Sequence, residues 1–290
     1  MTEIDQPVPP SRVYSDVEYI FEARSATMPP LREYLAELWE RRRFMVALAK
    51  ADLRGPRANT VIGELWGVLD PLFQAAIYWF LITVLRKGRG GSGSEYLSLI
   101  VSSVFLFNFT RIALSEGGRS VLKSKGLMLN STFPRALLPI SSVYKGLLEF
   151  APSVGVYLVI HILLRRPFGP GLFMLPLLFA IQIALSLGLA MLFAALTVYI
   201  RDLTNVLNYV LRVLLFVTPV IYPVSLLTPT LRSILKINPL FTLFAAYQSI
   251  ILGDVPSASL VIQSLLWAAL FLVVGFRVFV SNERSFALRL

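Results

Sequence analysis

The sequence contains no cysteine, a single histidine and few charged residues. Without cysteine, the chain can form neither disulfides nor thiolate metal sites, and it has no cysteine nucleophile. Charged residues make up 15% of its 290 residues and hydrophobic residues 56%, and the mean hydropathy is +0.70. One soluble core of this length could not bury so much apolar surface. The composition therefore predicts an integral membrane protein.

Two further absences concern function. No Gly-Lys dipeptide occurs, so the chain has no phosphate-binding loop of the GxxxxGK[ST] kind and is not expected to hydrolyse ATP. An integral-membrane glycosyltransferase, one alternative, needs acidic residues clustered at a membrane face, whereas Asp70, Glu116 and Glu149 are scattered. We therefore predict that the chain is not an enzyme and carries no catalytic residues, metal site or cofactor of its own.

Six apolar stretches of about 20 residues, the length needed to cross a bilayer, divide the chain. They lie near 65–85, 96–114, 140–164, 172–199, 206–224 and 258–280. Residues 1–30 are too polar to pack a core and predict a disordered cytoplasmic tail. We predict an all-α integral membrane fold, with one transmembrane domain over residues 31–290.

Lysine and arginine are distributed unevenly around these stretches. With six crossings, sixteen lie on the side of both termini and seven on the opposite side. The positive-inside rule therefore predicts that both termini are cytoplasmic, in a multi-pass protein of the plasma (inner) membrane. The net charge of +10 then reflects topology and contact with membrane lipids, and we expect no nucleic-acid partner.

The segment 31–50, before the first stretch, has its apolar residues on one helical face and its charged residues largely on the other. This pattern predicts a helix lying in the cytoplasmic interface, with Trp39 at headgroup depth and Arg41, Arg42 and Arg43 toward anionic lipid. The alternative is a helix packed on a soluble partner domain.

The stretch 115–146 is too long for a simple turn between two spans. We expect a short helix over 116–125 that ends at Gly126, the usual residue for a left-handed cap, followed by a stiff segment containing Pro134. This elbow is predicted to expose four apolar residues to the cytoplasm, Leu127, Met128, Leu129 and Phe133. Exposed apolar residues on a stiff loop indicate a docking surface. The alternative is a loop folded back on its own helices.

The fifth apolar stretch carries an arginine in its middle. At a lipid-facing bilayer centre Arg212 would cost about 2.5–3.5 kcal/mol, so we expect it to face protein or water. It would then either contact a passing anionic diphosphate or pair with Glu149. Just before the stretch, Asp202 fits the position of a helix cap.

The same stretch stops at prolines, and two short apolar pieces follow it, near 229–236 and 240–252. A broken helix at membrane depth is tolerated only beside protein or a water-filled cavity. We therefore predict re-entrant helices that close a channel, with a gate formed by Pro219, Tyr222 and Pro223.

Aromatic residues of the first two stretches are candidates for lining a substrate path, because sugar rings can slide over aromatic faces. The candidates are Trp66, Phe73, Tyr78, Phe105 and Phe109. The alternative is that these side chains pack within the membrane or lie at its interfaces.

Several motifs together resemble a known family. They are GELWGVLDP (63–71), NSTFPRALLPISSV (130–143), RDL (201–203) with TPVIYP (218–223), and NPL (238–240) followed by Tyr247. In this order they resemble the ABC-2 type permeases that export polysaccharides such as O-antigen and teichoic acid. The resemblance covers residues 31–280, and the Arg-, Ala-, Leu- and Val-rich composition suggests an actinobacterial version that exports cell-wall galactan.

The resemblance implies a homodimer paired with two copies of an ATP-binding subunit, which would hold the ATP and Mg. It implies that the elbow is the coupling helix, formed by Leu127, Met128, Leu129, Phe133, Pro134 and Arg135. A second contact with the ATPase side would be made by Arg201 and Asp202. The expected substrate is a polyprenyl-diphosphate-linked glycan, and the alternative within this fold is an ABC-2 permease for a drug or lipid.

Overall fold

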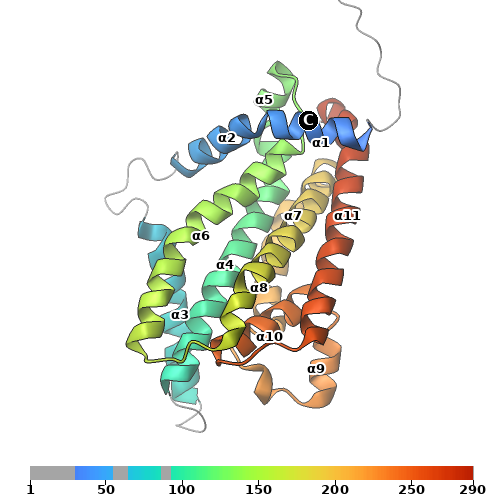
Figure 1. Cartoon of the computed structure of the whole chain (residues 1–290). Helices are drawn as coiled ribbons and strands as arrows, with labels where there is room; N and C mark the ends of the chain where they lie inside the picture. The colour runs from blue at the N-terminus through green and yellow to red at the C-terminus, as the bar shows by residue number, and fades with distance from the viewer. Residues whose placement is uncertain (1–29, 55–64, 86–92, 290) are drawn as a thin grey trace, which may run out of the picture.

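The computed structural model describes residues 30–54, 65–85 and 93–289, and these residues form helices and loops only. The predicted tail over residues 1–30 lies almost wholly outside the described residues. Five long helices run side by side as a bundle (Figure 1). They are α3 (Trp66–Leu85), α4 (Gly93–Lys123), α6 (Leu137–Leu163), α7 (Leu175–Tyr199) and α11 (Ala258–Arg289).

Four helical stretches of the described residues are long and apolar enough to cross a membrane. They are Gly93–Lys123, Leu137–Leu163, Pro170–Tyr199 (the 3₁₀ turn η3, Pro170–Met174, with α7) and Ala258–Phe286. α3 has 20 residues, about the length that a span needs. These helices confirm the predicted all-α integral membrane fold.

The fifth apolar stretch, 206–224, is not one continuous helix. α8 (Leu203–Val217) has 15 residues, short of the roughly 20 that cross a bilayer. It ends before Pro219 because proline lacks the N–H and clashes with the preceding turn. The chain continues through the 3₁₀ turn η4 (Val224–Leu226), α9 (Pro229–Leu235) and α10 (Pro239–Ile251). α9 and α10 correspond to the two short apolar pieces, and α10 is almost entirely buried.

The expected helix over 116–125 does not exist as a separate element. α4 continues unbroken to Lys123, and Gly126 lies inside the following helix α5 (Lys125–Asn130) instead of ending a helix. Gly117 and Gly118 do not interrupt α4, because both pack tightly: an added Cβ would lie 2.6 Å from Ala190 Cβ and 2.9 Å from Leu207. Close helix packing therefore offsets the low helix propensity of glycine.

Three short helices gather at one end of the bundle. α1 (Leu31–Glu40) and α2 (Arg42–Arg54) lie across this end, near α5 and the C-terminal end of α11 (Figure 1). At the other end lies α9. We call these the α1 end and the α9 end.

Candidate functional site

The elbow between α4 and α6 is folded against its own protein. Met128 is buried in a cluster with Tyr34, Val121 and Phe286, and Leu127 and Phe133 pack at the edge of that cluster. The Phe133 ring lies 5.4 Å from the ring of Phe44 on α2. The expectation that these three residues are exposed is therefore wrong, because α1, α2 and α11 cover them. The side chain of Leu129 lies outside the described part of the structure.

Polar contacts fix the same elbow to α1 and α11. Arg135 donates to the backbone oxygen of Glu283, and the Tyr34 hydroxyl donates to the Glu283 carboxylate at 2.5 Å. Burial, with the negative charge of Glu283 beside it, raises the pKa of Tyr34 above its usual value, so this hydroxyl stays protonated. Pro134 is buried next to this contact. The elbow, α1 and α11 therefore form one connected unit.

Among the side chains of the elbow that the structure describes, those exposed to solvent are not apolar. Exposed residues are Lys125, Gly126, Asn130, Ser131 and Thr132. Arg41 donates from Nη1 to the Thr132 oxygen at 2.8 Å, which holds the loop after α5 against the junction of α1 and α2. A docking partner at the elbow would therefore contact these polar residues, which lie over the apolar cluster of Met128.

The segment 31–50 forms two helices with a single non-helical residue, Arg41, between them. On α1, Tyr34 and Leu38 face the protein, whereas Leu31, Leu35 and Trp39 form an exposed stripe at i, i+4 and i+8. Trp39 is 69% exposed, and the Arg42 guanidinium lies 4.7 Å from its ring centre. Arg43 is also exposed. An apolar stripe beside arginines is the pattern expected of a helix in the headgroup region.

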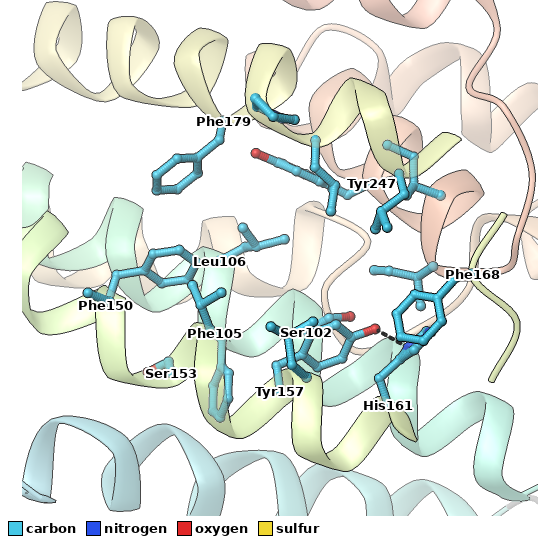
Figure 2. Close-up of a pocket in the computed structure, with 18 of the residues that line it drawn as sticks. Ser102, Phe105, Leu106, Phe150, Ser153, Tyr157, His161, Phe168, Phe179 and Tyr247 are labelled. Carbon is cyan, nitrogen blue, oxygen red and sulfur yellow. Dashed lines mark hydrogen bonds between the residues drawn. The ribbon is translucent and has the colours of Figure 1, made fainter. Parts of the chain in front are cut away.

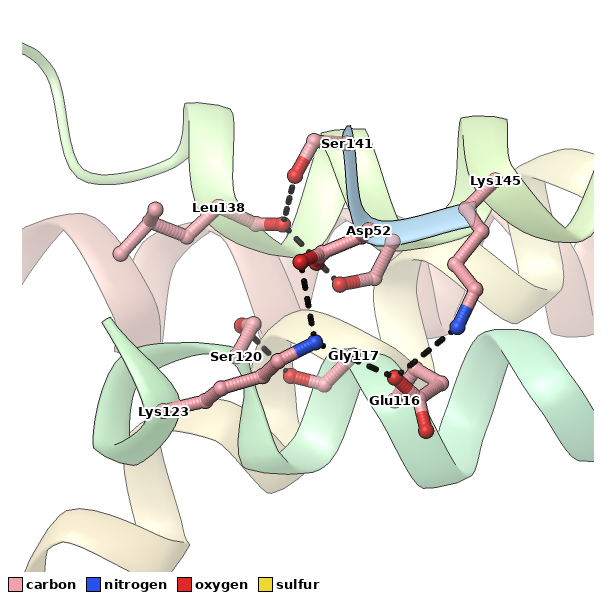
Figure 3. Close-up of polar contacts among 9 residues, drawn as sticks. Asp52, Glu116, Gly117, Ser120, Lys123, Leu138, Ser141 and Lys145 are labelled. Carbon is pink, nitrogen blue, oxygen red and sulfur yellow. Dashed lines mark hydrogen bonds and ion pairs between the residues drawn. The ribbon is translucent and has the colours of Figure 1, made fainter. Parts of the chain in front are cut away.

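A cluster of four charged residues joins α2, α4 and α6 near the α1 end (Figure 3). Lys145 Nζ lies 3.3 Å from Glu116, Lys123 Nζ lies 3.8 Å from the same carboxylate, and Lys123 also lies 3.0 Å from Asp52. Lys145 is buried, and Glu116 is the carboxylate beside it. The sequence did not identify this cluster, because its members are far apart along the chain.

The turn between α7 and α8 exposes both of its charged residues, Arg201 and Asp202. Asp202 occupies the N-cap position of α8, but its side chain makes no capping hydrogen bond, so the expected capping role is wrong. The turn lies at the α1 end, because Tyr199 donates to Asn282 on the last part of α11 at 2.8 Å. Its two charges are free to meet a partner at this end.

α8 has one buried and one exposed face. Leu207 and Leu211 are buried, whereas Val206, Tyr209, Val213 and Phe216 are between 48% and 65% exposed. Arg212 is exposed on the same helix, with its guanidinium 5.6 Å from the Tyr209 ring centre. Among the described residues no ion pair joins Arg212 to an acidic side chain, so its pairing with Glu149 and its contact with a diphosphate both stay predictions. An apolar face with an arginine at mid-helix requires protein or water beside it.

The aromatic candidates divide into two groups. Trp66 and Phe73 are exposed on α3, and Tyr78 is partly buried there against the core. Phe105 and Phe109 on α4 are buried at 2% and 1% exposure. Phe109 packs against the rings of Phe150 and Phe179, 6.0 and 5.4 Å away. Phe109 is thus packed in the core, and its place on a substrate path stays a prediction.

Side chains hold the predicted gate in place. The Gln248 amide of α10 donates to the Pro219 and Tyr222 oxygens at 2.7 and 2.9 Å and accepts from Val224 N–H at 2.9 Å. Tyr96 of α4 donates to the Ile221 oxygen at 2.7 Å. These four backbone groups of the broken segment are thus satisfied within the protein, as is needed where no water can reach them. A lone glutamine in the apolar run FTLFAAYQSIIL was the signal that could have identified Gln248.

The NPL and TPVIYP motifs meet at this segment. Asn238 caps α10 by accepting from Leu240 N–H at 3.0 Å, and Pro239 occupies the first turn, where proline is tolerated. The same Asn238 side chain donates to Thr218 Oγ1 at 2.9 Å. Deeper in the bundle, Tyr247 donates to Gln182 at 2.9 Å. The motif residues of the second half therefore fix α10 to the end of α8.

Comparison with known proteins shows which family the chain belongs to. Residues 44–252 match the model of the ABC-2 type transporter family. The chain belongs to the ABC-2 type transporter family. The resemblance carried by its motifs is thereby confirmed, and this ABC-2 chain is a multi-pass membrane protein.

Two relatives of this ABC-2 chain carry the same name. It is 26% identical over 216 residues to the O-antigen export system permease protein RfbA of Myxococcus xanthus, covering 74% of this chain and 82% of the relative. It is 20% identical over 245 residues to RfbA of Klebsiella pneumoniae, covering 84% and 93%. The similarity therefore extends over most of the membrane bundle.

Proposed function

We propose that this ABC-2 chain is the permease subunit of an ATP-driven exporter that moves a lipid-linked polysaccharide across the plasma membrane from the cytoplasmic side. The observation that carries the proposal is its similarity, over most of its length, to relatives named O-antigen export permeases. The composition adds a finer proposal, that the polysaccharide is a cell-wall galactan. On the positive-inside rule the α1 end, which holds both the start of the described chain and its C-terminal helix end, faces the cytoplasm.

The proposed assembly is a homodimer with two copies of an ATP-binding subunit. The exposed apolar face of α8 supports the homodimer, because a second copy related by a two-fold axis would cover the same face. The polar tip of the elbow and the Arg201–Asp202 turn lie at the α1 end and are the proposed contacts with the ATP-binding subunit. ATP and Mg would bind to that subunit.

Arg212 is the proposed contact for the diphosphate of the lipid carrier. It lies ten residues from Asp202, so along a helix it is about 15 Å from the α1 end of α8, at the depth of the hydrocarbon region. A permanently charged guanidinium can bind two phosphate oxygens at once. The exposed aromatic residues of α3 would offer the following sugars a path with few directional bonds.

To test the proposal, the chromosomal copy would be depleted and replaced by wild-type, Arg212→Ala, Arg212→Lys or Arg277→Ala protein. Arg277 is the matched control, an exposed arginine on a long apolar helix other than α8. Depletion is expected to accumulate lipid-linked polysaccharide on the cytoplasmic side. Arg212→Ala should lower export at least several-fold, Arg212→Lys should retain part of it, and Arg277→Ala should export at the wild-type rate.

Two results would each contradict one part of the proposed function. If depletion leaves the polysaccharide distribution unchanged but alters export of a drug or lipid, the substrate class is wrong. If export depends on the chain but Arg212→Ala matches Arg277→Ala, the residue has no role in guiding the diphosphate, and the substrate class stands.

A further inference from the structure

The bundle also contains a cavity that the proposed export path does not use. A cavity of 610 Å³ lies between α6, α7 and η3, with α4 and α10 behind it. Figure 2 shows Phe179 reaching toward it from one helix and Phe150, Tyr157 and His161 from the facing one. The residues that line it are mainly apolar and aromatic. Its volume falls within the range of about 300–1,000 Å³ typical of small-ligand sites.

The cavity is lined by a long stretch of α6. Along α6 it extends from Leu147 to His161, a separation of about 21 Å at the rise of a helix. This exceeds the roughly 15 Å that is half of a bilayer's hydrocarbon core. Near the Leu147 end it is lined by the stacked rings of Phe150 and Phe179, whose centres lie 5.0 Å apart. A flexible apolar chain matches this shape better than a compact molecule does.

The cavity opens sideways, toward the surface that faces lipid. Leu158, Phe168, Leu172 and Pro176 line it and are themselves exposed. A chain could therefore enter from the bilayer without passing through the bundle. The exposed face of α8, where we place the second subunit, contributes no residue to its lining.

Polar and basic groups lie at the outer end of the cavity. Tyr157 and His161 share a hydrogen bond at 3.1 Å, and the Tyr157 hydroxyl also contacts Ser98 at 3.2 Å. Arg165 and Arg166 follow four and five residues after His161, and the Arg166 backbone N–H donates to the His161 backbone oxygen at 3.1 Å. Neither arginine is itself among the lining residues. Arg166 lies 3.6 Å from Glu95, yet its buried Nε has no partner among the described residues. Two arginines therefore lie in the chain next to the lining residues of the mouth, one of them paired with Glu95.

We propose that this cavity binds one hydrocarbon chain of an anionic phospholipid, with the lipid phosphate at Arg165 and Arg166. The apolar length holds the chain, and the basic mouth selects the headgroup. The phospholipid comes from the leaflet at the α9 end of the bundle. It would fill space between α6 and α7 that the protein's own side chains leave open.

The test uses the full chain in phosphatidylcholine vesicles that contain a small fraction of a phospholipid with a diazirine at its acyl-chain end. After irradiation, labelled residues are mapped by mass spectrometry. With diazirine phosphatidylglycerol, label is expected on Leu106 and Phe150, which line the cavity. Labelling by diazirine phosphatidylcholine should be several-fold weaker.

Filling the cavity provides the control. Ala151→Phe and Leu158→Trp, two exposed rim positions, should each reduce this labelling several-fold in protein that remains monodisperse. Val159→Phe, on the same helix but outside the cavity, should leave it unchanged. Replacing Arg165 and Arg166 together by Gln should remove the preference for phosphatidylglycerol.

Four outcomes would overturn the proposal. Absence of label on Leu106 and Phe150, or equal labelling in the filled variants, would mean that no chain enters. Equal labelling by the two headgroups would reject the anionic lipid. Displacement by polyprenyl phosphate but not by phosphatidylglycerol would assign the cavity to a carrier lipid instead.

Discussion

Gln248 shows how one side chain can stabilise a broken helix in a membrane. Its amide contacts the Pro219 oxygen, the Tyr222 oxygen and the Val224 N–H. No water is available in the bilayer core to satisfy these groups, so each would otherwise carry a desolvation cost. The segment that the sequence suggested as a gate is therefore held to α10, and any opening must either move α10 with it or break these bonds.

Replacing Gln248 should consequently affect this segment first. Gln248→Leu keeps a similar volume but leaves two carbonyls and one N–H without a partner, so we expect a loss of about 2–5 kcal/mol in unfolding free energy. Gln263→Leu, at a half-buried glutamine on α11 whose hydrogen bond to Ser259 is exposed, is the matched control and should change stability little. Thermal unfolding in detergent and hydrogen exchange of residues 219–224 provide the measurements. Equal melting temperatures and equal exchange for the two variants would show that the amide is dispensable.

At the level of helices, the cluster of Asp52, Glu116, Lys123 and Lys145 links α2 to α4 and α6 by ion pairs. Glu116 lies between two lysines, one buried and one 52% exposed, whereas the outer pair of Lys123 with Asp52 is reachable by solvent. Exposed ion pairs contribute about 0–1 kcal/mol, but removing the partner of a buried charge costs considerably more. Substitutions at the buried end and at the exposed end of the cluster should therefore change the unfolding free energy by different amounts.

We expect Glu116→Gln to lower the unfolding free energy by about 1.5–3 kcal/mol, the range for hydrogen bonds to charged groups. Asp52→Asn should cost no more than about 1 kcal/mol. Adding Lys145→Met to Glu116→Gln should restore part of the loss, because the buried charge is then gone. A double-mutant cycle measured by thermal unfolding checks this, and strict additivity of the two changes would contradict a coupled pair.

The sequence predicted the positions of the long helices better than the contacts between them. Spans near 65–85, 140–164 and 258–280 correspond to α3, α6 and α11, because long apolar runs bounded by polar breakers leave few other structures in a bilayer. The exposure of Met128 was wrongly predicted, since only the folded chain brings α1, α2 and α11 over the elbow. Glu116 and Lys145 are likewise partners through helix packing, which residue spacing does not reveal.

On the scale of the whole molecule, the exposed face of α8 is the surface that most needs to be covered by a neighbour. Its exposed stripe is apolar yet contains Arg212, which makes plain lipid a costly neighbour. A two-fold axis along this stripe would cover the apolar residues with their own copies and enclose the two arginines between subunits. The same placement would leave the lateral cavity of α6 and α7 open to lipid.

The absence of cysteine makes this arrangement directly testable, because any introduced thiol is the only one in the chain. Val206→Cys, Val213→Cys and Phe216→Cys on α8 should each form covalent dimers with a membrane-permeant bismaleimide, most strongly at the residue nearest the axis. Val159→Cys and Ile162→Cys on α6, at 57% and 61% exposure, match the 59% of Val213 and should remain monomeric. Dimers would be scored by denaturing electrophoresis of intact membranes. If the α6 positions cross-link and those on α8 do not, the subunits meet through the other face, and Arg212 must then be satisfied without a second copy.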